Sequence, residues 1–213
     1  MDFKNGISLC MIVKNEEQYL QSCLNSVKDY VNEICIVDTG STDSTIQIIS
    51  NFTSNSMFNG KITLGFYEKA YTNSTDLFHF AEARNQSLKL ASFDKILILD
   101  ADEVVVNPEV LQAQFIWIHK NKGGFVNFNN VNANFDHKSI RLFWNNYLYF
   151  YGRIHEYLMI GNTILDGVET NLNIRHFGYQ PSIMTSKNKI KRNELLLKEQ
   201  ADARHCVCVG ARE

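Results

Sequence analysis

The sequence lacks the features that mark several large classes of protein. It has only 2 prolines and 11 glycines in 213 residues, which excludes a low-complexity chain. It contains no run of apolar residues near the roughly 18 that a membrane span requires. Lys and Arg total 21 against 23 Asp and Glu, so the charge balance offers no excess of basic residues for bulk nucleic-acid binding. We therefore expect a globular protein with no transmembrane segment and no nucleic-acid partner.

Cysteine is also scarce and unpatterned. The five cysteines are scattered, and Cys206 and Cys208 form a C-x-C pair with no second pair to complete a zinc site. The first residues lack the charged-then-apolar layout of a secretion signal. These observations favour a cytoplasmic protein with reduced thiols.

What the sequence does contain is an alternation of apolar strands and amphipathic helices. Strands are predicted at 7–13, 33–37, 62–67 and 95–99, and helices at 15–31, from the turn at 38–43 to about Phe52, and at 79–91. Buried strands separated by helices require right-handed crossovers and a mainly parallel sheet. We expect an α/β fold with one domain over residues 1–180.

The pattern of predicted elements changes after Glu103. A helix is predicted at 110–120, and strand-like segments follow at 125–128, 140–143, 147–151 and 172–176. This second half is more antiparallel in character. A helix over 186–203 would form a C-terminal helical extension, residues 181–213.

Acidic side chains follow two of the predicted parallel strands. Ligands of open parallel sheets bind beyond the carboxyl ends of the strands. Asp38 ends one strand, where its carboxylate can accept a hydrogen bond from a nucleotide or cap the next helix. Asp100 and Asp102 follow another strand, and neighbouring carboxylates repel unless a cation such as Mg²⁺ or Mn²⁺ lies between them. Such a cation would bridge the two phosphates of a nucleotide diphosphate. The glycine motifs of dinucleotide and P-loop sites do not occur.

Four segments together resemble glycosyltransferase family 2, which has the GT-A fold, a Rossmann-like sheet flanked by helices. They are MIVKNEE at 11–17, IVDTGSTD at 36–43, ARN at 83–85 and LILDADE at 97–103, in the order found in the family. The resemblance extends from about residue 7 to about residue 179. Within the family, segments 153–156 and 176–179 resemble bacterial members related to the peptide S-glycosyltransferases and the lipopolysaccharide-core transferases.

The resemblance implies metal-dependent, inverting transfer of a sugar from a nucleotide-diphospho-sugar, with UDP-sugar as the expected donor. It implies that Asp38 holds the base, that Asp100 faces the ribose and the metal region, and that Asp102 ligates Mn²⁺ or Mg²⁺. Glu17 and Arg84 are implied as further nucleotide contacts. His176 is either a second metal ligand, as in other GT-A enzymes, or a core histidine.

Inverting transfer also requires a base that takes the proton of the attacking acceptor group. Glu156, in the segment GRIHE at 152–156, is the candidate, and the alternative is a surface carboxylate paired with Arg153. Asp136 and Asp166 are weaker candidates.

The sequence is compatible with other functions and with several acceptors and partners. One alternative, a sugar nucleotidyltransferase, would need a glycine-rich basic loop, which residues 14–17 lack. The main alternative is a non-catalytic protein of the same fold that binds a nucleotide-sugar or acts as a scaffold. The acceptor could be a peptide, a glycan or a lipid-linked sugar. Basic residues at 187–192 would permit peripheral contact with a membrane surface, and exposed leucines at 195–197 would favour an oligomer.

Overall fold

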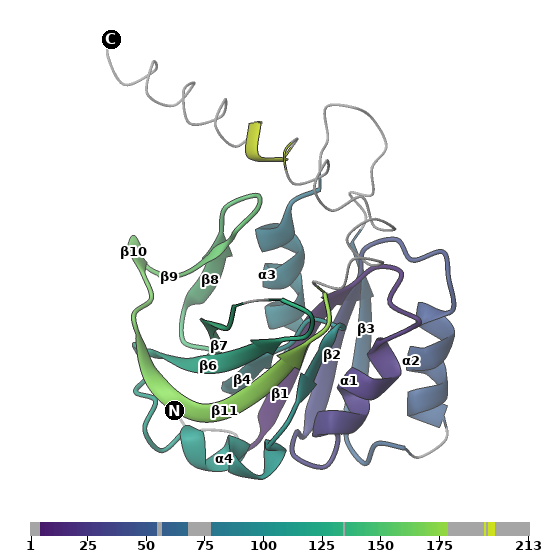
Figure 1. Cartoon of the computed structure of the whole chain (residues 1–213), viewed down its shortest axis with the longest axis horizontal. Coiled ribbons are helices and arrows are strands. Elements are labelled where there is room, and N and C mark those ends of the chain that lie inside the picture. Colours follow the sequence, from purple (N-terminus) through teal and green to yellow (C-terminus); the bar gives the residue numbers. More distant parts are fainter. Residues whose placement is uncertain are drawn as a thin grey trace.

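The computed structural model describes residues 5–54, 57–67, 78–133, 135–178, 194 and 196–198. Its centre is an eight-stranded mixed sheet with the order β3-β2-β1-β4-β7-β6-β11-β5. Helices and a small second sheet cover the two faces of this sheet (Figure 1).

The first half of the large sheet is parallel. β1 (Ile7–Val13) lies between β2 (Glu33–Asp38) and β4 (Lys95–Ile98), and β3 (Lys61–Phe66) pairs with β2 at the edge. The side chains of β1, β2 and β4 are almost all buried, as expected for strands that are covered on both faces. These strands all end at the same edge of the sheet.

The second half is mostly antiparallel. β7 (His137–Trp144) pairs antiparallel with β4 and with β6 (Gly123–Asn130), and β5 (Glu103–Val105) pairs antiparallel with β11 (Gly167–His176). β6 and β11 pair in parallel. A separate three-stranded sheet contains β8 (Leu148–Tyr151), β9 (Tyr157–Ile160) and β10 (Thr163–Ile164).

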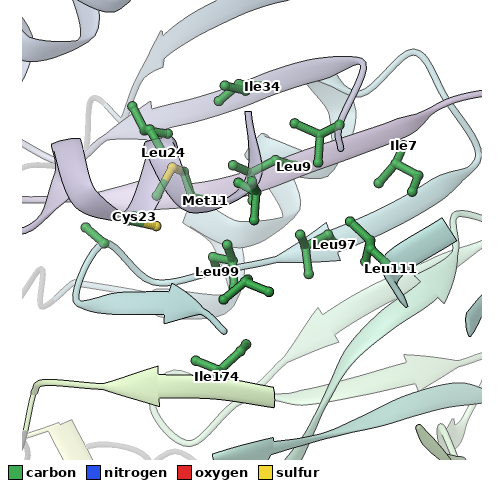
Figure 2. Close-up of a cluster of buried hydrophobic side chains, with 14 of the residues drawn as sticks. Ile7, Leu9, Met11, Cys23, Leu24, Ile34, Leu97, Leu99, Leu111 and Ile174 are labelled. Atoms are coloured by element: carbon green, nitrogen blue, oxygen red, sulfur yellow. The ribbon is translucent and has the colours of Figure 1, made fainter. Parts of the chain in front are cut away.

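The helices divide the core into two sides. α1 (Leu20–Val27) buries Leu20, Cys23, Leu24 and Val27, a spacing that forms one apolar face. That face and α2 (Thr45–Ser54) pack against one side of the sheet (Figure 2). α3 (Phe80–Leu90) contacts β1, β2 and β8, and the core on its side also includes side chains of β8 and β9. A short η1 (Pro108–Val110) and α4 (Leu111–Gln114) complete the elements.

The predicted α/β fold with a mixed, mainly parallel sheet is confirmed, whereas two predicted helices are shorter than expected. The helix predicted at 15–31 is only α1, because Asn15 has a left-handed backbone with φ 54° and the loop at 15–17 bonds to the loop after β2. The helix predicted at 110–120 is reduced to η1 and α4, which turns follow. Of the helix predicted at 186–203, only 194 and 196–198 fall within the described residues, and these are helical.

Within the described part of the chain, no helix has the length and apolarity to cross a membrane.

Candidate active site

The predicted acidic residues lie at one edge of the sheet. Asp38 is level with Val13 of the neighbouring strand, and Ile98 is level with Cys10, so β1 separates Asp38 from the loop at Asp100. Two strand spacings correspond to about 10 Å. The carboxyl ends of the parallel strands thus bring both acidic groups to the same side of the molecule, as expected.

The loops after β1 and β2 are joined to each other by hydrogen bonds. The backbone N–H of Thr42 donates to Asn15 Oδ1 at 2.8 Å, and the backbone N–H of Ser44 donates to Glu17 Oε2 at 3.0 Å. In return, the backbone N–H of Glu17 donates to Asp43 Oδ2 at 3.1 Å. Glu17, predicted to contact the nucleotide, therefore caps the segment that leads into α2.

Asp38 keeps one carboxylate oxygen available within this loop. Its Oδ2 accepts hydrogen bonds from the backbone N–H groups of Gly40 at 2.9 Å and Ser41 at 3.0 Å. Gly40 has φ 97°, a conformation that favours glycine. Asp38 is only 4% exposed, and its Oδ1 is buried with no hydrogen-bond partner among the described residues. A buried acceptor without a partner is costly, so this atom can take a hydrogen bond from a ligand N–H or O–H group.

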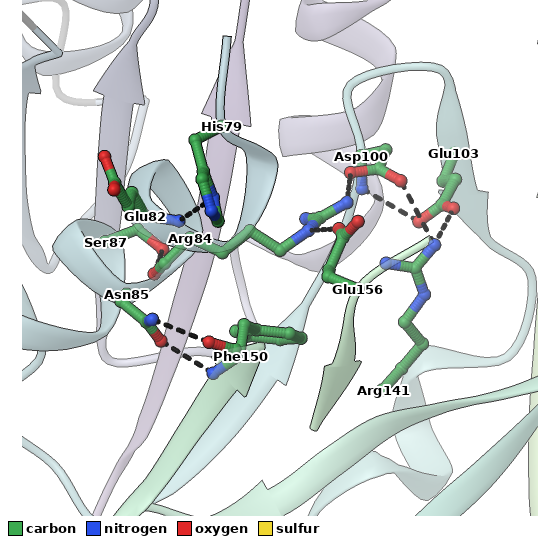
Figure 3. Close-up of polar contacts among 10 residues, drawn as sticks. All are labelled: His79, Glu82, Arg84, Asn85, Ser87, Asp100, Glu103, Arg141, Phe150 and Glu156. Carbon is green, nitrogen blue, oxygen red and sulfur yellow. Dashed lines mark hydrogen bonds and ion pairs between the residues drawn. The ribbon is translucent and has the colours of Figure 1, made fainter. Parts of the chain in front are cut away.

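Five charged side chains form an arginine–carboxylate cluster beyond β4 (Figure 3), namely Arg84, Asp100, Glu103, Arg141 and Glu156. Arg84 extends from α3; its Nη2 lies 2.9 Å from Asp100 Oδ1, and its Nε donates to Glu156 Oε1. Arg141 extends from β7, and its Nη2 lies 3.1 Å from Asp100 Oδ2 and 2.5 Å from Glu103 Oε1. The cluster therefore joins residues from four separate parts of the chain.

The two arginines determine the charge state of Asp100. Burial by itself raises the pKa of Asp100, but the guanidinium groups of Arg84 and Arg141 outweigh it and hold this pKa well below its usual range. Burial raises the pKa of Glu103 to about 7, with Arg141 opposing the shift. Contrary to the expectation from the sequence, Asp100 does not need a cation to compensate its charge, because Arg84 and Arg141 already do so.

Asp102 and His176 form a separate pair. Asp102 is 6% exposed, and its Oδ1 lies 3.6 Å from Nε2 of His176, the last residue of β11. Burial lowers the pKa of His176, but Asp102 beside it more than offsets this and raises the pKa above its usual value. A Cβ on Gly178 would come within 2.5 Å of both Asp102 Oδ2 and His176 Nε2, so the backbone can approach this pair so closely only with glycine at position 178.

An oxygen donor and an imidazole nitrogen side by side fit Mn²⁺, which accepts both kinds of ligand. Among the described residues, no group of three or more His, Cys, Asp or Glu side chains could hold a metal ion. A cation between Asp102 and His176 would accordingly need further ligands from water or a bound diphosphate.

The structure also places the remaining candidates. The side chain of Glu156 is only 13% exposed and pairs with Arg84. It is therefore not the surface carboxylate that the alternative assumed. Arg84 donates hydrogen bonds to Glu156 and Asp100. The nearby Glu82, on the same helix, accepts instead from the Tyr67 hydroxyl at 2.7 Å. Asp136 accepts from the backbone N–H of Asn130 at 3.4 Å. Asp166 is exposed and pairs with Lys122.

Sequence reasoning missed Arg141 and Glu103. Glu103 lies in the segment LDADE, next to the residues that were singled out. Arg141 lies within a strand between Ile140 and Leu142, and its side chain is 13% exposed. A charged residue within the apolar segment IRLF at 140–143 was the available signal, because burial of an arginine requires acidic partners.

Comparisons with known proteins find relatives that match part or most of this chain. Glycosyltransferase SunS from the SPbeta prophage of Bacillus subtilis is 30% identical over 212 residues, which cover 91% of this chain and 44% of SunS. A TPR repeat-containing protein of Synechococcus elongatus is 40% identical over 100 residues, covering 47% of this chain and 21% of that protein. The chain spans less than half the length of each of these relatives.

Solved structures give weaker matches. S. aureus TarS 1-349 has 24% sequence identity and a TM-score of 0.48, over 61% of this chain and 37% of that one. The family, in contrast, is matched over most of the sequence. Residues 8–180 match the family model described as Glycosyl transferase family 2, and the chain belongs to this family.

Proposed function

We propose that the chain is a metal-dependent, inverting glycosyltransferase that moves a sugar from a UDP-sugar to an acceptor. The observation that carries the proposal is that Arg84 joins Glu156 to Asp100 at the edge where the parallel strands end. This position of Glu156 supports a role in proton transfer at the predicted donor site. We assign the chemistry to the domain at residues 1–180.

Binding of the donor is assigned to the first half of the sheet. Asp38 Oδ1, buried and without a partner, would accept a hydrogen bond from an N–H group of the base. Asp100 would face the ribose and the metal region. Arg84 keeps one buried N–H group, Nη1, without a partner and would direct it toward the donor.

The cation is assigned to Asp102 and His176. When bound, Mn²⁺ or Mg²⁺ would neutralise the charge that develops on the leaving diphosphate. The carboxylate of Asp102 and the imidazole of His176 would hold it on the protein side.

Glu156 is assigned the role of general base. The acceptor group attacks C1 of the sugar from the face opposite the diphosphate, its proton passes to the Glu156 carboxylate, and the bond from C1 to the phosphate oxygen breaks. Arg84, bonded to Glu156 Oε1, fixes the orientation of this carboxylate. The acceptor class stays open between a peptide, a glycan and a lipid-linked sugar.

The proposal is tested by donor turnover, with water or a supplied acceptor receiving the sugar. Glu156→Gln should lower the rate by about 100-fold or more because it removes the base, and should leave donor affinity nearly unchanged. Glu169→Gln is the matched control, since Glu169 is an exposed carboxylate paired with Lys138 at 2.6 Å. Donor binding without turnover in the unmodified protein would contradict the proposal and support a non-catalytic nucleotide-sugar-binding protein.

A further inference from the structure

Asn130, the last residue of β6, links two histidines behind the Asp102–His176 pair. It is only 4% exposed. Its amide nitrogen Nδ2 lies 2.8 Å from the carbonyl oxygen of Phe135 and 2.9 Å from His137 Nδ1. Its amide oxygen Oδ1 lies 3.0 Å from His176 Nδ1. All three contacts involve buried or partly buried atoms.

These contacts leave one orientation for the Asn130 amide. A backbone carbonyl oxygen can only accept, so the NH₂ group must face Phe135, and its second hydrogen then points to His137 Nδ1. The oxygen consequently faces His176. This oxygen can only accept and lies 3.0 Å from Nδ1 of His176, whereas Asp102 Oδ1 lies 3.6 Å from Nε2, beyond hydrogen-bond distance, so the single hydrogen of a neutral ring goes to Nδ1. A neutral His176 is therefore held with its lone pair on Nε2, the atom that lies 3.6 Å from Asp102 Oδ1.

The ring planes are also held in place. The His137 ring stacks on Phe128 with centroids 4.6 Å apart and planes 8° apart. The His176 ring meets Phe128 edge-on, with centroids 6.3 Å apart and planes 82° apart. Phe128 is only 1% exposed, so the ring that both histidines contact is itself packed in the core.

We propose that Asn130 is a positioning residue that keeps His176 in the Nδ1–H tautomer, so that Nε2 is available to a divalent cation shared with Asp102. Histidines that bind metals in proteins commonly donate their other ring N–H to such an outer partner. The cation part of this inference rests on the proposed function. The tautomer part does not, because it follows from hydrogen bonds within the metal-free chain.

The tautomer is measured by ¹⁵N nuclear magnetic resonance of the metal-free protein at alkaline pH, where the imidazole is neutral. The His176 signal is assigned by comparison with a His176→Gln variant. The unmodified protein should show a hydrogen on Nδ1. Asn130→Leu should shift the hydrogen toward Nε2, because no acceptor remains at Nδ1 while Asp102 can accept from Nε2. A hydrogen on Nε2 in the unmodified protein, or an unchanged tautomer in Asn130→Leu, would overturn the inference.

Two further variants separate positioning from general damage. Asn129→Leu makes the same change at the neighbouring exposed position and should leave the tautomer as it is. Asn130→Asp retains an oxygen for His176 Nδ1 and should retain the Nδ1–H form, although it loses the donor to Phe135. If Asn130→Leu does not fold, the Asn130→Asp result and the tautomer of the unmodified protein still decide the question.

The cation part is measured by electron paramagnetic resonance of Mn²⁺ in the presence of UDP. Asn130→Leu should weaken Mn²⁺ binding by about 10- to 100-fold, as loss of an outer partner commonly does. Asn129→Leu should leave Mn²⁺ affinity unchanged. Equal affinity in Asn130→Leu and the unmodified protein would overturn this part. An Nδ1–H tautomer in a protein that binds no Mn²⁺ would support the control of the tautomer by Asn130 while contradicting the proposed function.

Discussion

Three buried polar atoms without a partner belong to residues of the candidate site. They are Asp38 Oδ1, Arg84 Nη1 and Arg141 Nε. Buried polar groups in proteins are nearly always hydrogen-bonded, so such atoms at the carboxyl edge of a parallel sheet suggest contacts that a ligand completes. Their chemistry is complementary to a nucleotide diphosphate, since one oxygen accepts from a base and the N–H groups donate to phosphate.

The role of Asp38 can be tested by Asp38→Asn. The asparagine oxygen can still accept from Gly40 and Ser41, but an NH₂ group then replaces the free acceptor. A hydrogen bond to a charged group contributes about 1.5–3 kcal/mol, so UDP affinity should fall by about 10- to 100-fold. Calorimetric titration measures this, and Asp29→Asn, at an exposed position, is the control. Unchanged affinity in Asp38→Asn would remove Asp38 from the nucleotide site.

Glu33, at the opposite end of β2 from Asp38, has a structural role that pH can reveal. It is 1% exposed and accepts hydrogen bonds from Ser8 Oγ at 2.5 Å, Ser92 Oγ at 2.7 Å and the backbone N–H of Phe93 at 3.2 Å. Burial alone raises the pKa of Glu33, but these bonds outweigh it and leave the pKa below its usual value. Its carboxylate thus stabilises the fold above the unfolded pKa of about 4.3, and this contribution is lost as pH falls through the folded pKa.

We therefore expect Glu33→Gln to lower the free energy of unfolding by more than about 1 kcal/mol at pH 7. The difference should shrink at a pH below about 4.3, because the unfolded chain then takes up a proton that the folded carboxylate does not. Denaturant unfolding at the two pH values measures both. Glu109→Gln, at an exposed position, should show no such change. A Glu33→Gln cost that grows on acidification would contradict the assigned hydrogen-bond role.

At the scale of elements, the loops after β1 and β2 act as one unit. Their mutual hydrogen bonds delay the start of α1 to Leu20 and cap the approach to α2. This unit also holds Asp38, whose Oδ2 accepts hydrogen bonds from Gly40 and Ser41, so we expect it to shape the proposed donor site.

Glu17→Ala tests whether Glu17 belongs to this scaffold or contacts the nucleotide. Loss of the acceptor for the Ser44 N–H should lower the free energy of unfolding by about 1 kcal/mol, the usual effect of removing a helix cap. UDP affinity should stay within a few-fold of the unmodified protein. Thermal unfolding and calorimetry on the same samples give both values. A large loss of UDP affinity at unchanged stability would instead assign Glu17 to the nucleotide.

The elements also show how far sequence reasoning reaches. Continuous apolar runs predicted β1, β2 and β4, and helical periodicity predicted α3, because those patterns are local. The left-handed Asn15 depends on bonds to a loop 26 or more positions away, so no local pattern indicates it. The parallel pairing of β6 with β11 is likewise not indicated by any local pattern, because strands far apart in sequence meet only in the folded sheet.

At the scale of the whole molecule, the candidate site draws on both halves of the sheet. The parallel half contributes Asp38 and Asp100, while β7 contributes Arg141, β11 contributes His176 and the loop before β9 contributes Glu156. The antiparallel pairing of β4 with β7 joins the halves. Sequence motifs identified most of these residues through family resemblance. Arg141, a partner of Asp100, was missed because its contact depends on side-chain packing across this junction.

The central claim is that the site binds a nucleotide diphosphate together with a divalent cation held by Asp102. Calorimetric titration of UDP with and without Mn²⁺, in the unmodified protein and in Asp102→Ala, tests it most directly. UDP should bind more tightly when Mn²⁺ is present, and Asp102→Ala should abolish most of that enhancement. UDP affinity that is indifferent to Mn²⁺, or an enhancement that survives intact in Asp102→Ala, would contradict the account.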